Sequence, residues 1–251
     1  MCGLAGFILQ GPKLATDLAS LNHKMISQIT HRGPDDLGVW SDDALGIGLS
    51  HSRLAIQDCS SAGSQPMHSE SNRYVIVFNG EIYNHFELRK EILKESIIRT
   101  SWRGRSDTET LLASFEAWGV QETLLRCVGM FAFALIDKQN QTLFLGRDRF
   151  GEKPLYYGFA GENFIFGSEL KALKPFPGFD CSISKEALSN FIKLSYIPTP
   201  QSIYKDIFKL EAGHFIKINI NNFSRSSVYN NPYWSIEESM ASSSQKPYLT
   251  E

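Results

Sequence analysis

Apolar residues occur along much of the chain in short runs separated by polar turns, a pattern that indicates β-strands. The longest buried-strand run covers 130–136, and a second strand-like segment, 142–145, follows it after a polar turn. Further strand-like segments are 3–9, 39–40, 45–49, 74–78, 155–159 and 164–166. Because short turns connect many neighbouring segments, the pattern favours antiparallel sheets over a parallel sheet.

Helical periodicity occurs in a few separate blocks. Apolar residues recur at spacings of three and four between Leu14 and Ile29, which predicts one amphipathic helix. A second helix is expected to begin at Asn84, and a third at Ser106, where Ser106 and Glu109 have the spacing of a capping box. A fourth is expected over 184–194. The chain is therefore predicted to be an α+β protein with helices packed on antiparallel sheets.

The 251 residues fit one large domain or two small ones. Beyond about residue 221 the composition becomes polar and rich in Ser and Asn, and 240–245 is typical of a flexible linker. We therefore expect a folded domain over 1–220 and a polar linker or tail over 221–251.

Charge and hydropathy exclude several functional classes. The net charge of −2 provides no electrostatic footprint for nucleic acid. No apolar run is long enough to span a bilayer, and the start of the chain does not resemble a signal peptide, so the cytoplasm is the expected compartment. The four cysteines are not at metal-ligand spacing and are too scattered for a disulfide framework, so we expect thiols and no metal site.

Cys2 is a candidate nucleophile because it stands at the start of the chain. If Met1 is removed, the thiol and the α-amine belong to one residue, and an α-amine with a pKa of about 7.7–8.0 is partly a free base near neutrality. The amine can then take the thiol proton and activate the sulfur. Taken alone, Cys2 is better explained as part of a buried first strand.

Asn79 and Gly80 follow the strand-like segment 74–78. Asn-Gly is the strongest short turn signal, so a tight turn is the simpler explanation of this pair taken alone. In a catalytic site, the Asn amide and the Gly N–H would instead donate hydrogen bonds to a single point. Two such donors stabilise the oxyanion that forms when a thiolate attacks a carboxamide.

Three charged residues also have both an ordinary and a ligand-binding explanation. Arg53 lies between strand residues, where an arginine is usually solvated, but its guanidinium can also bind a carboxylate through two hydrogen bonds. Asp107 falls in the first turn of an expected helix, where it complements the helix dipole. Either Asp107 or Glu81 can accept a hydrogen bond from an ammonium group. Together with the nucleophile and the oxyanion donors, this set suits a small zwitterion that carries a carboxamide, namely glutamine.

A series of motifs extends this interpretation. In order along the chain they are Met1-Cys2-Gly3-Leu4-Ala5-Gly6, His31-Arg32-Gly33-Pro34-Asp35, Ser50-His51-Ser52-Arg53-Leu54-Ala55-Ile56, Gln65-Pro66-Met67, Asn79-Gly80-Glu81-Ile82-Tyr83-Asn84-His85, Ser106-Asp107-Thr108-Glu109, Gly129-Met130-Phe131-Ala132-Phe133-Ala134, Gly146-Arg147-Asp148-Arg149-Phe150-Gly151-Glu152-Lys153-Pro154-Leu155-Tyr156-Tyr157 and Ser168-Glu169-Leu170-Lys171-Ala172-Leu173. They resemble the class II (N-terminal nucleophile) glutamine amidotransferase domain of glutamine-hydrolysing asparagine synthetase. The resemblance extends over roughly residues 1–234.

The resemblance implies a four-layer αββα sandwich, in which two antiparallel sheets lie between helical layers. It implies that Cys2 is the nucleophile and that Asn79 and Gly80 form the oxyanion hole. Arg53 would bind the carboxylate of L-glutamine, and Asp107 and Glu81 its ammonium group. The backbone of Leu54, Ala55, Ile56 and Gln57 would line the substrate pocket, although Gln57 stands where the family usually has an apolar residue.

The resemblance also implies partners beyond this chain. The pyrophosphate loop of the synthetase half, Ser-Gly-Gly-x-Asp-Ser, does not occur in the sequence. ATP and Mg²⁺ are therefore expected only on an absent synthetase domain or subunit that receives the ammonia, and no cofactor is expected in this domain. A homodimer is possible. The expected reaction supports asparagine synthesis or a related carboxylate amidation; the alternatives are amidation of a sugar acid in surface polysaccharide, or a catalytically idle scaffold.

Overall fold

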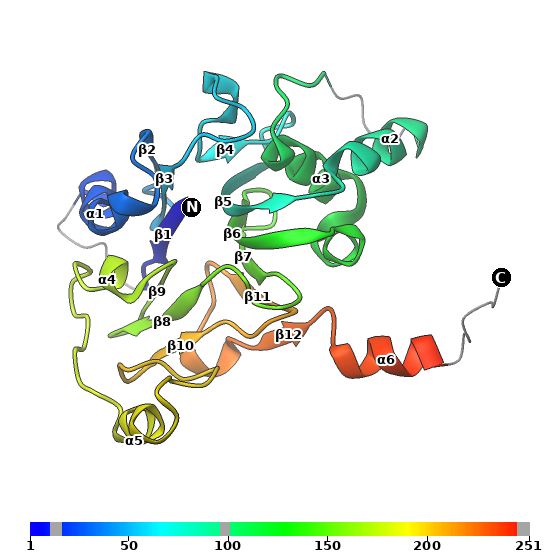
Figure 1. Ribbon diagram of the computed structural model, residues 1–251. Helices are drawn as coiled ribbons and strands as arrows, with labels where there is room; N and C mark the ends of the chain where they lie inside the picture. The colour runs from blue at the N-terminus through cyan, green and yellow to red at the C-terminus, as the bar shows by residue number, and fades with distance from the viewer. Residues whose placement is uncertain (11–16, 96–100, 245–251) are drawn as a thin grey trace.

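The computed structural model describes residues 1–10, 17–95 and 101–244. Two six-stranded antiparallel sheets face each other, and we name them after the strands that carry the candidate site (Figure 1). The β1 sheet has the strand order β10 (Ile207–Lys209), β8 (Tyr156–Ala160), β9 (Asn163–Gly167), β1 (Gly3–Ile8), β3 (Ile47–Arg53) and β2 (Asp36–Asp42). The β5 sheet has the order β12 (Asn230–Pro232), β11 (His214–Asn219), β7 (Thr142–Arg147), β6 (Gly129–Asp137), β5 (Tyr74–Ile82) and β4 (Met67–His68).

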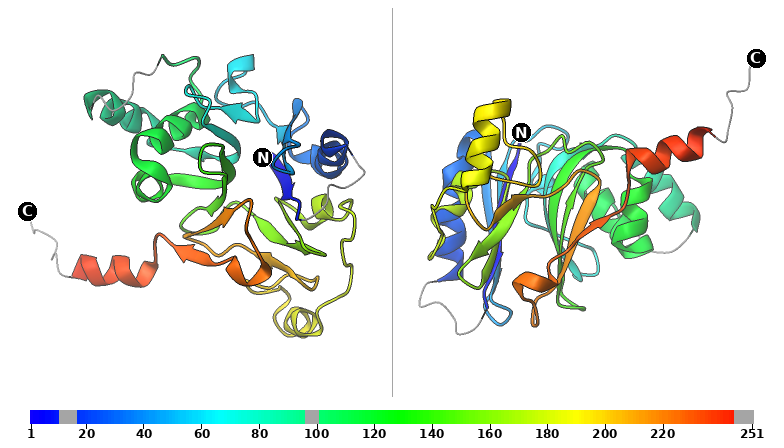
Figure 2. Two further views of the ribbon diagram at one scale, coloured as in Figure 1. Left: turned by 180° about the vertical axis from the view of Figure 1, so that it is seen from behind. Right: turned by 90° about the horizontal axis from the view of Figure 1, so that it is seen from below.

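Helices cover the outer face of each sheet, as the two views of Figure 2 show. On the β1 sheet lie α1 (Leu18–Ile26), the 3₁₀ helix η1 (Ser27–Arg32) and α4 (Leu170–Leu173). On the β5 sheet lie α2 (His85–Glu95) and α3 (Asp107–Arg126). The remaining helices are η2 (Ser61–Gly63), α5 (Lys185–Leu194), η3 (Arg225–Ser227) and α6 (Ile236–Ser244). The structure is thus the expected α+β, four-layer αββα sandwich.

The apolar pattern of the strands explains why the layers form. Alternate residues of a strand point to opposite faces of its sheet. In β5, Val75 and Val77 pack between the two sheets, whereas Ile76 and Phe78 pack toward α3. Both faces of β5 are therefore apolar, so residues 74–78 form a continuous hydrophobic run in the sequence. Buried apolar layers on both sides of the central strands hold the two sheets together and attach the helices to their outer faces.

The structure corrects the expectation that a turn begins at Asn79. Strand β5 continues to Ile82, because β6 pairs with it throughout, including Asn79 opposite Ala132 and Gly80 opposite Phe131. Gly80 suits this strand because a Cβ there would lie 2.3 Å from the carbonyl oxygen of Met130. The tight-turn explanation of the Asn-Gly pair is therefore wrong.

The expected helices are present with changed details. Leu14 lies outside the described residues, and the first helix is divided into α1 and η1. At the start of α3, the Ser106 hydroxyl accepts a hydrogen bond from the Thr108 N–H at 3.1 Å. The expected capping box does not form, because the Glu109 carboxylate instead accepts hydrogen bonds from the backbone N–H groups that precede Ser106.

The folded domain extends beyond the predicted boundary at residue 220. Phe223 and Tyr233 are buried, and β12 pairs with β11. Isolated apolar residues among Ser and Asn gave the sequence no periodic signal here. The predicted linker over 240–245 is also wrong for 240–244, which belong to α6, whereas 245–251 lie outside the described residues. In the part of the chain that the structure describes, no helix has the length and apolar character that crossing a membrane requires.

Candidate active site

Cys2 lies directly before β1, a central strand with β3 on one side and β9 on the other. Because Gly3 pairs with Ser52, the thiol is brought beside Leu54, whose N–H donates to Cys2 Sγ at 3.3 Å. Burial raises the pKa of the Cys2 thiol, while the Leu54 hydrogen bond, the N-terminal amine and the Arg53 charge act in the opposite direction. At rest the sulfur therefore keeps its proton.

Asn79 supplies a hydrogen-bond donor that has no partner among the described residues. Its side chain is 1% exposed, and its Nδ2 atom is buried with no hydrogen bond. An unpaired buried amide costs free energy, roughly 1–3 kcal/mol, so a native protein that keeps one usually uses it. Asn79 lies on the same face of β5 as Val75 and Val77, and therefore points toward the β1 sheet that carries Cys2.

The backbone N–H of Gly80, at the outer edge of β5, is a second hydrogen-bond donor next to Asn79. Strand β4 pairs with Val75 and Ile76, and within the described part of the chain no strand pairs with this edge beyond them. The Phe78 N–H donates instead to Gln65 Oε1 at 2.6 Å, and the Ile82 N–H to Asp107 Oδ2 at 2.8 Å. Because alternate N–H groups of a strand face the same edge, the Gly80 N–H between them also faces outward, into the pocket described next.

A single pocket brings together every residue that the sequence singled out for the site. Those residues are Cys2, Arg53, Leu54, Ala55, Ile56, Gln57, Asn79, Gly80, Glu81 and Asp107. Residues that sequence reasoning did not assign also line it, among them Asp58, Gln65, Met130 and Lys153. Gln65, Met130 and Lys153 all belong to the motifs that carry the family resemblance, which was the available signal for them. The two sheets and the segments that follow β3 and precede α3 thus meet around one cavity.

Arg53 lies at the end of β3 and its guanidinium fixes the loop that closes one side of the pocket. Its Nη1 donates to Ser64 Oγ at 3.2 Å, and its Nη2 donates to the carbonyls of Ser60, at 3.0 Å, and Asp58. A guanidinium has five N–H donors, so these three hydrogen bonds leave donors for a ligand. The charge is held at the pocket with little freedom to move.

Asp107 is the buried acid of the pocket, with 5% of its surface exposed. Burial raises its pKa to about 6, although hydrogen bonds from the N–H groups of Ile82 and Thr108 oppose that shift. Glu81 lies nearby and its charge adds to the rise. At neutral pH the Asp107 carboxylate is therefore mostly ionised, and a cation in the pocket would stabilise that form.

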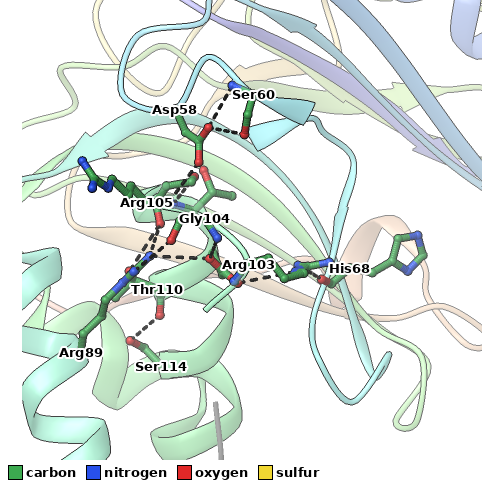
Figure 3. A network of polar contacts seen from close by, with 12 residues as sticks. Asp58, Ser60, His68, Arg89, Arg103, Gly104, Arg105, Thr110 and Ser114 are labelled. Atoms are coloured by element: carbon green, nitrogen blue, oxygen red, sulfur yellow. Dashed lines mark hydrogen bonds and ion pairs between the residues drawn. The ribbon is translucent and has the colours of Figure 1, made fainter. Parts of the chain in front are cut away.

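A polar network ties the two loops of the pocket together (Figure 3). Asp58 Oδ2 accepts a hydrogen bond from the Arg105 N–H at 3.0 Å, and Asp58 Oδ1 accepts one from the Ser60 N–H at 2.9 Å. On the α3 side, Arg89 donates to the carbonyls of Gly104, at 3.1 Å, and Ser106, at 2.9 Å. The loop held by Arg53 is thereby fixed to the segment that leads into Asp107.

Two antiparallel sheets between helical layers, with a cysteine directly before a central strand of one sheet, form the sandwich of the N-terminal nucleophile hydrolase fold. Within that class, the chain belongs to the family of the glutamine amidotransferase domain, whose family model matches residues 1–234.

Curated relatives agree with that assignment. The chain is 37% identical to asparagine synthetase [glutamine-hydrolyzing] 1 of Bacillus subtilis (strain 168) over 85% of this chain and 33% of the relative. It is 33% identical to asparagine synthetase [glutamine-hydrolyzing] 3 of the same organism over 94% of this chain and 37% of the relative. The chain therefore spans a third to about a half of the length of the curated relatives that it matches.

A solved structure supports the fold. The chain is similar to the glutamine phosphoribosylpyrophosphate amidotransferase of B. subtilis complexed with ADP and GMP, with a TM-score of 0.64. The identity is 16%, and the match covers 93% of this chain and 49% of that chain. At this identity the likeness establishes the architecture alone. Among the described residues, no group of three or more His, Cys, Asp or Glu side chains is placed to hold a metal ion.

Proposed function

We propose that this domain hydrolyses L-glutamine to glutamate and ammonia, with Cys2 as the nucleophile. The observation that carries the proposal is the buried Nδ2 of Asn79, which has no hydrogen-bond partner among the described residues and lies in the same pocket as the Cys2 thiol and the outward-facing edge of Gly80. Two donors that converge near a thiol are what an acyl-transfer oxyanion requires.

The charged groups of the pocket support glutamine as the substrate. The α-carboxylate and the α-ammonium of glutamine are attached to one carbon, so both must be recognised at the same end of the pocket. Arg53 is assigned to the carboxylate, and Asp107 with Glu81 to the ammonium group. Leu54, Ala55, Ile56 and Gln57 form the wall along which the side chain would extend toward Cys2.

The proposed reaction begins with removal of Met1, because an amide nitrogen at residue 2 is not a base. The free α-amine of Cys2 takes the thiol proton, and the sulfur attacks the carboxamide carbon. Asn79 Nδ2 and the Gly80 N–H donate to the resulting oxyanion. The C–N bond then breaks, the amine returns its proton to the leaving ammonia, and a thioester remains. Water attacks the thioester, with the same amine as base, and releases glutamate and the free thiol.

The proposed destination of the ammonia is an ATP-dependent carboxylate amidation, with asparagine synthesis as the first candidate. The names of the curated relatives support this choice. The amidation would need a synthetase domain or subunit that carries ATP and Mg²⁺, whereas the glutaminase step itself uses only side chains and backbone of this domain. We propose the cytoplasm as its compartment, because a catalytic thiol requires reducing conditions. A homodimer stays a prediction.

The function is tested by intact-protein mass spectrometry combined with an assay for ammonia release from glutamine. We expect Met1 to be absent from the active preparation, and Cys2→Ala to abolish ammonia release while the protein stays folded. Full activity in a preparation that retains Met1, or ammonia release by Cys2→Ala, would contradict the mechanism. A folded parent protein without glutaminase activity would instead favour the idle-scaffold alternative.

A further inference from the structure

The two halves of the proposed site lie on different sheets, so their separation depends on how the sheets are held together. Cys2 belongs to the β1 sheet, whereas Asn79 and Gly80 belong to the β5 sheet. Most of the space between the sheets is filled by apolar side chains. Apolar packing has no directional preference and does not by itself fix the sheets to the accuracy that a reaction needs.

His51 forms a directional contact across this space. It lies on β3, two residues after Leu49, so its side chain shares the face that packs against the β5 sheet. The imidazole is fully buried, and its Nε2 lies 3.0 Å from the carbonyl oxygen of Phe78, the residue before Asn79. Strand β3, which pairs with β1 beside Cys2, is therefore hydrogen-bonded to β5, the strand that carries Asn79 and Gly80.

The chemistry of this contact fixes the state of the imidazole. A carbonyl oxygen only accepts, so Nε2 must carry the proton. Burial lowers the pKa of His51 to about 4, and the ring is therefore neutral at physiological pH. Nδ1 is then an acceptor, and it is buried without a partner among the described residues. An apolar residue at this position would avoid the cost of the unpaired Nδ1 atom. The hydrogen bond to the Phe78 carbonyl is therefore the interaction that explains why a histidine is present here.

Gln65 holds the same residue of β5 from its N–H group. Gln65 Oε1 accepts from the Phe78 N–H at 2.6 Å, and Gln65 Nε2 donates to Thr108 Oγ1 at 3.4 Å. Both polar backbone groups of Phe78 are thus bound by side chains in place of a neighbouring strand. The two side chains thus provide hydrogen-bond partners for the backbone of Phe78 at the edge of β5. Gly80, the next residue that faces this edge, lines the pocket.

We propose that His51 and Gln65 are positioning residues of the oxyanion hole: they fix the backbone of Phe78, and so set the location of Asn79 and Gly80 relative to Cys2. This inference rests on the proposed glutaminase function. Neither residue supplies the nucleophile or an oxyanion donor, and both act through the backbone of Phe78. Their loss therefore lowers the rate of the chemical step while substrate binding changes little.

The test compares His51→Leu, which removes the donor, with His51→Gln, which keeps an N–H at a similar reach. A misplacement of about 1 Å costs up to about 100-fold, so we expect His51→Leu to lower kcat roughly 10–100-fold. KM for glutamine should change by less than about threefold, and His51→Gln should recover most of kcat. Labelling of Cys2 with methyl methanethiosulfonate needs no oxyanion donor, and should proceed at the parental rate in both variants.

Tyr157→Phe is the matched control. The Tyr157 hydroxyl, on β8, donates to Asn230 Oδ1, on β12, at 3.1 Å, and so forms another hydrogen bond between the two sheets outside the pocket. We expect this variant to keep the parental kcat. An equal loss in Tyr157→Phe would show that general sheet packing, and not the position of Phe78, controls the rate. A parental kcat in folded His51→Leu would also overturn the inference.

If circular dichroism shows that His51→Leu does not fold, the Gln65 variants test the positioning role instead. Gln65→Met removes the acceptor for the Phe78 N–H, whereas Gln65→Glu retains one. We expect a lower kcat for Gln65→Met and near-parental kcat for Gln65→Glu, and a parental kcat in Gln65→Met overturns the inference. Cys2→Ala distinguishes failure of the proposed function from failure of the positioning role. Continued ammonia release by Cys2→Ala would refute the proposed function. An inactive Cys2→Ala together with a fully active His51→Leu would refute only the positioning role.

Discussion

Asn79→Leu separates catalysis from stability, because the structure predicts opposite effects on the two. Loss of one oxyanion donor usually lowers kcat by roughly 10²–10³-fold, or about 2.7–4 kcal/mol of transition-state stabilisation. The same substitution removes a buried Nδ2 that has no hydrogen-bond partner among the described residues. Leucine has a similar shape, so packing between the sheets is largely retained.

The expected gain in stability can be estimated from the same atom. Leaving a buried donor unpaired costs about 1–3 kcal/mol, so its removal should raise the free energy of unfolding by about that amount. For a domain of this size, 1 kcal/mol shifts the midpoint of thermal unfolding by about 2–4 °C. We therefore expect Asn79→Leu to melt several degrees higher than the parent and to release ammonia far more slowly.

The assay measures kcat and KM for glutamine together with thermal unfolding of the same preparations. Asn84→Leu provides a control outside the pocket, since both ends of the Asn84 amide are hydrogen-bonded: Nδ2 donates to the Arg126 carbonyl at 2.9 Å, and Oδ1 accepts from the Val128 N–H at 2.9 Å. That variant should melt lower and keep the parental kcat. If Asn79→Leu melts lower and retains its kcat, Asn79 is a structural residue and the oxyanion assignment is wrong.

Further predictions concern the charged groups of the pocket. Arg53→Lys should lower kcat/KM for glutamine severely, because an ammonium group cannot replace the planar guanidinium that anchors the loop and faces the substrate; near-parental kcat/KM would refute the carboxylate role. The pKa of Asp107 is about 6 in the folded protein, against an ordinary value of 3.8. Protonation of Asp107 therefore stabilises the folded state at low pH, and this stabilisation is lost as the pH rises through about 6. Chemical unfolding should therefore show up to about 3 kcal/mol of this loss between pH 4 and pH 7 in the parent, and Asp107→Asn should abolish it. The same variant should be poor with glutamine but should handle an analogue without the α-amine about as well as the parent, and unchanged glutamine kinetics would leave Asp107 with a structural role only. The pKa of Asp58 is lowered to about 2 by hydrogen bonds from Ser60 and Arg105; Asp58→Ala should release the loop and raise KM for glutamine more than it lowers kcat, and steady-state kinetics that show no change in KM would exclude this coupling.

Local patterns in the sequence determined the central strands and the main helices, and the ordered motifs singled out residues that line one pocket. Strands β5 and β6 are buried on both faces, so their apolar runs are visible without any knowledge of their partners. The helix start at Ser106 is likewise a local signal, because a hydroxyl at that position caps the backbone of its own first turn. The order of the motifs, together with their residue types, was enough to indicate the family.

Only the tertiary structure decided where those residues meet and what holds them. Whether Asn79–Gly80 forms a turn or extends a strand depends on β6, about 50 residues further along the chain, and pairing over that distance leaves no local trace. The short strands β4 and β12 and the burial of Phe223 likewise depend on distant partners. The roles of His51 and Gln65 follow from hydrogen bonds to a backbone that neither residue neighbours in sequence. Local propensity records what a segment does alone, whereas a site built across two sheets depends on contacts that form only when both sheets are in place.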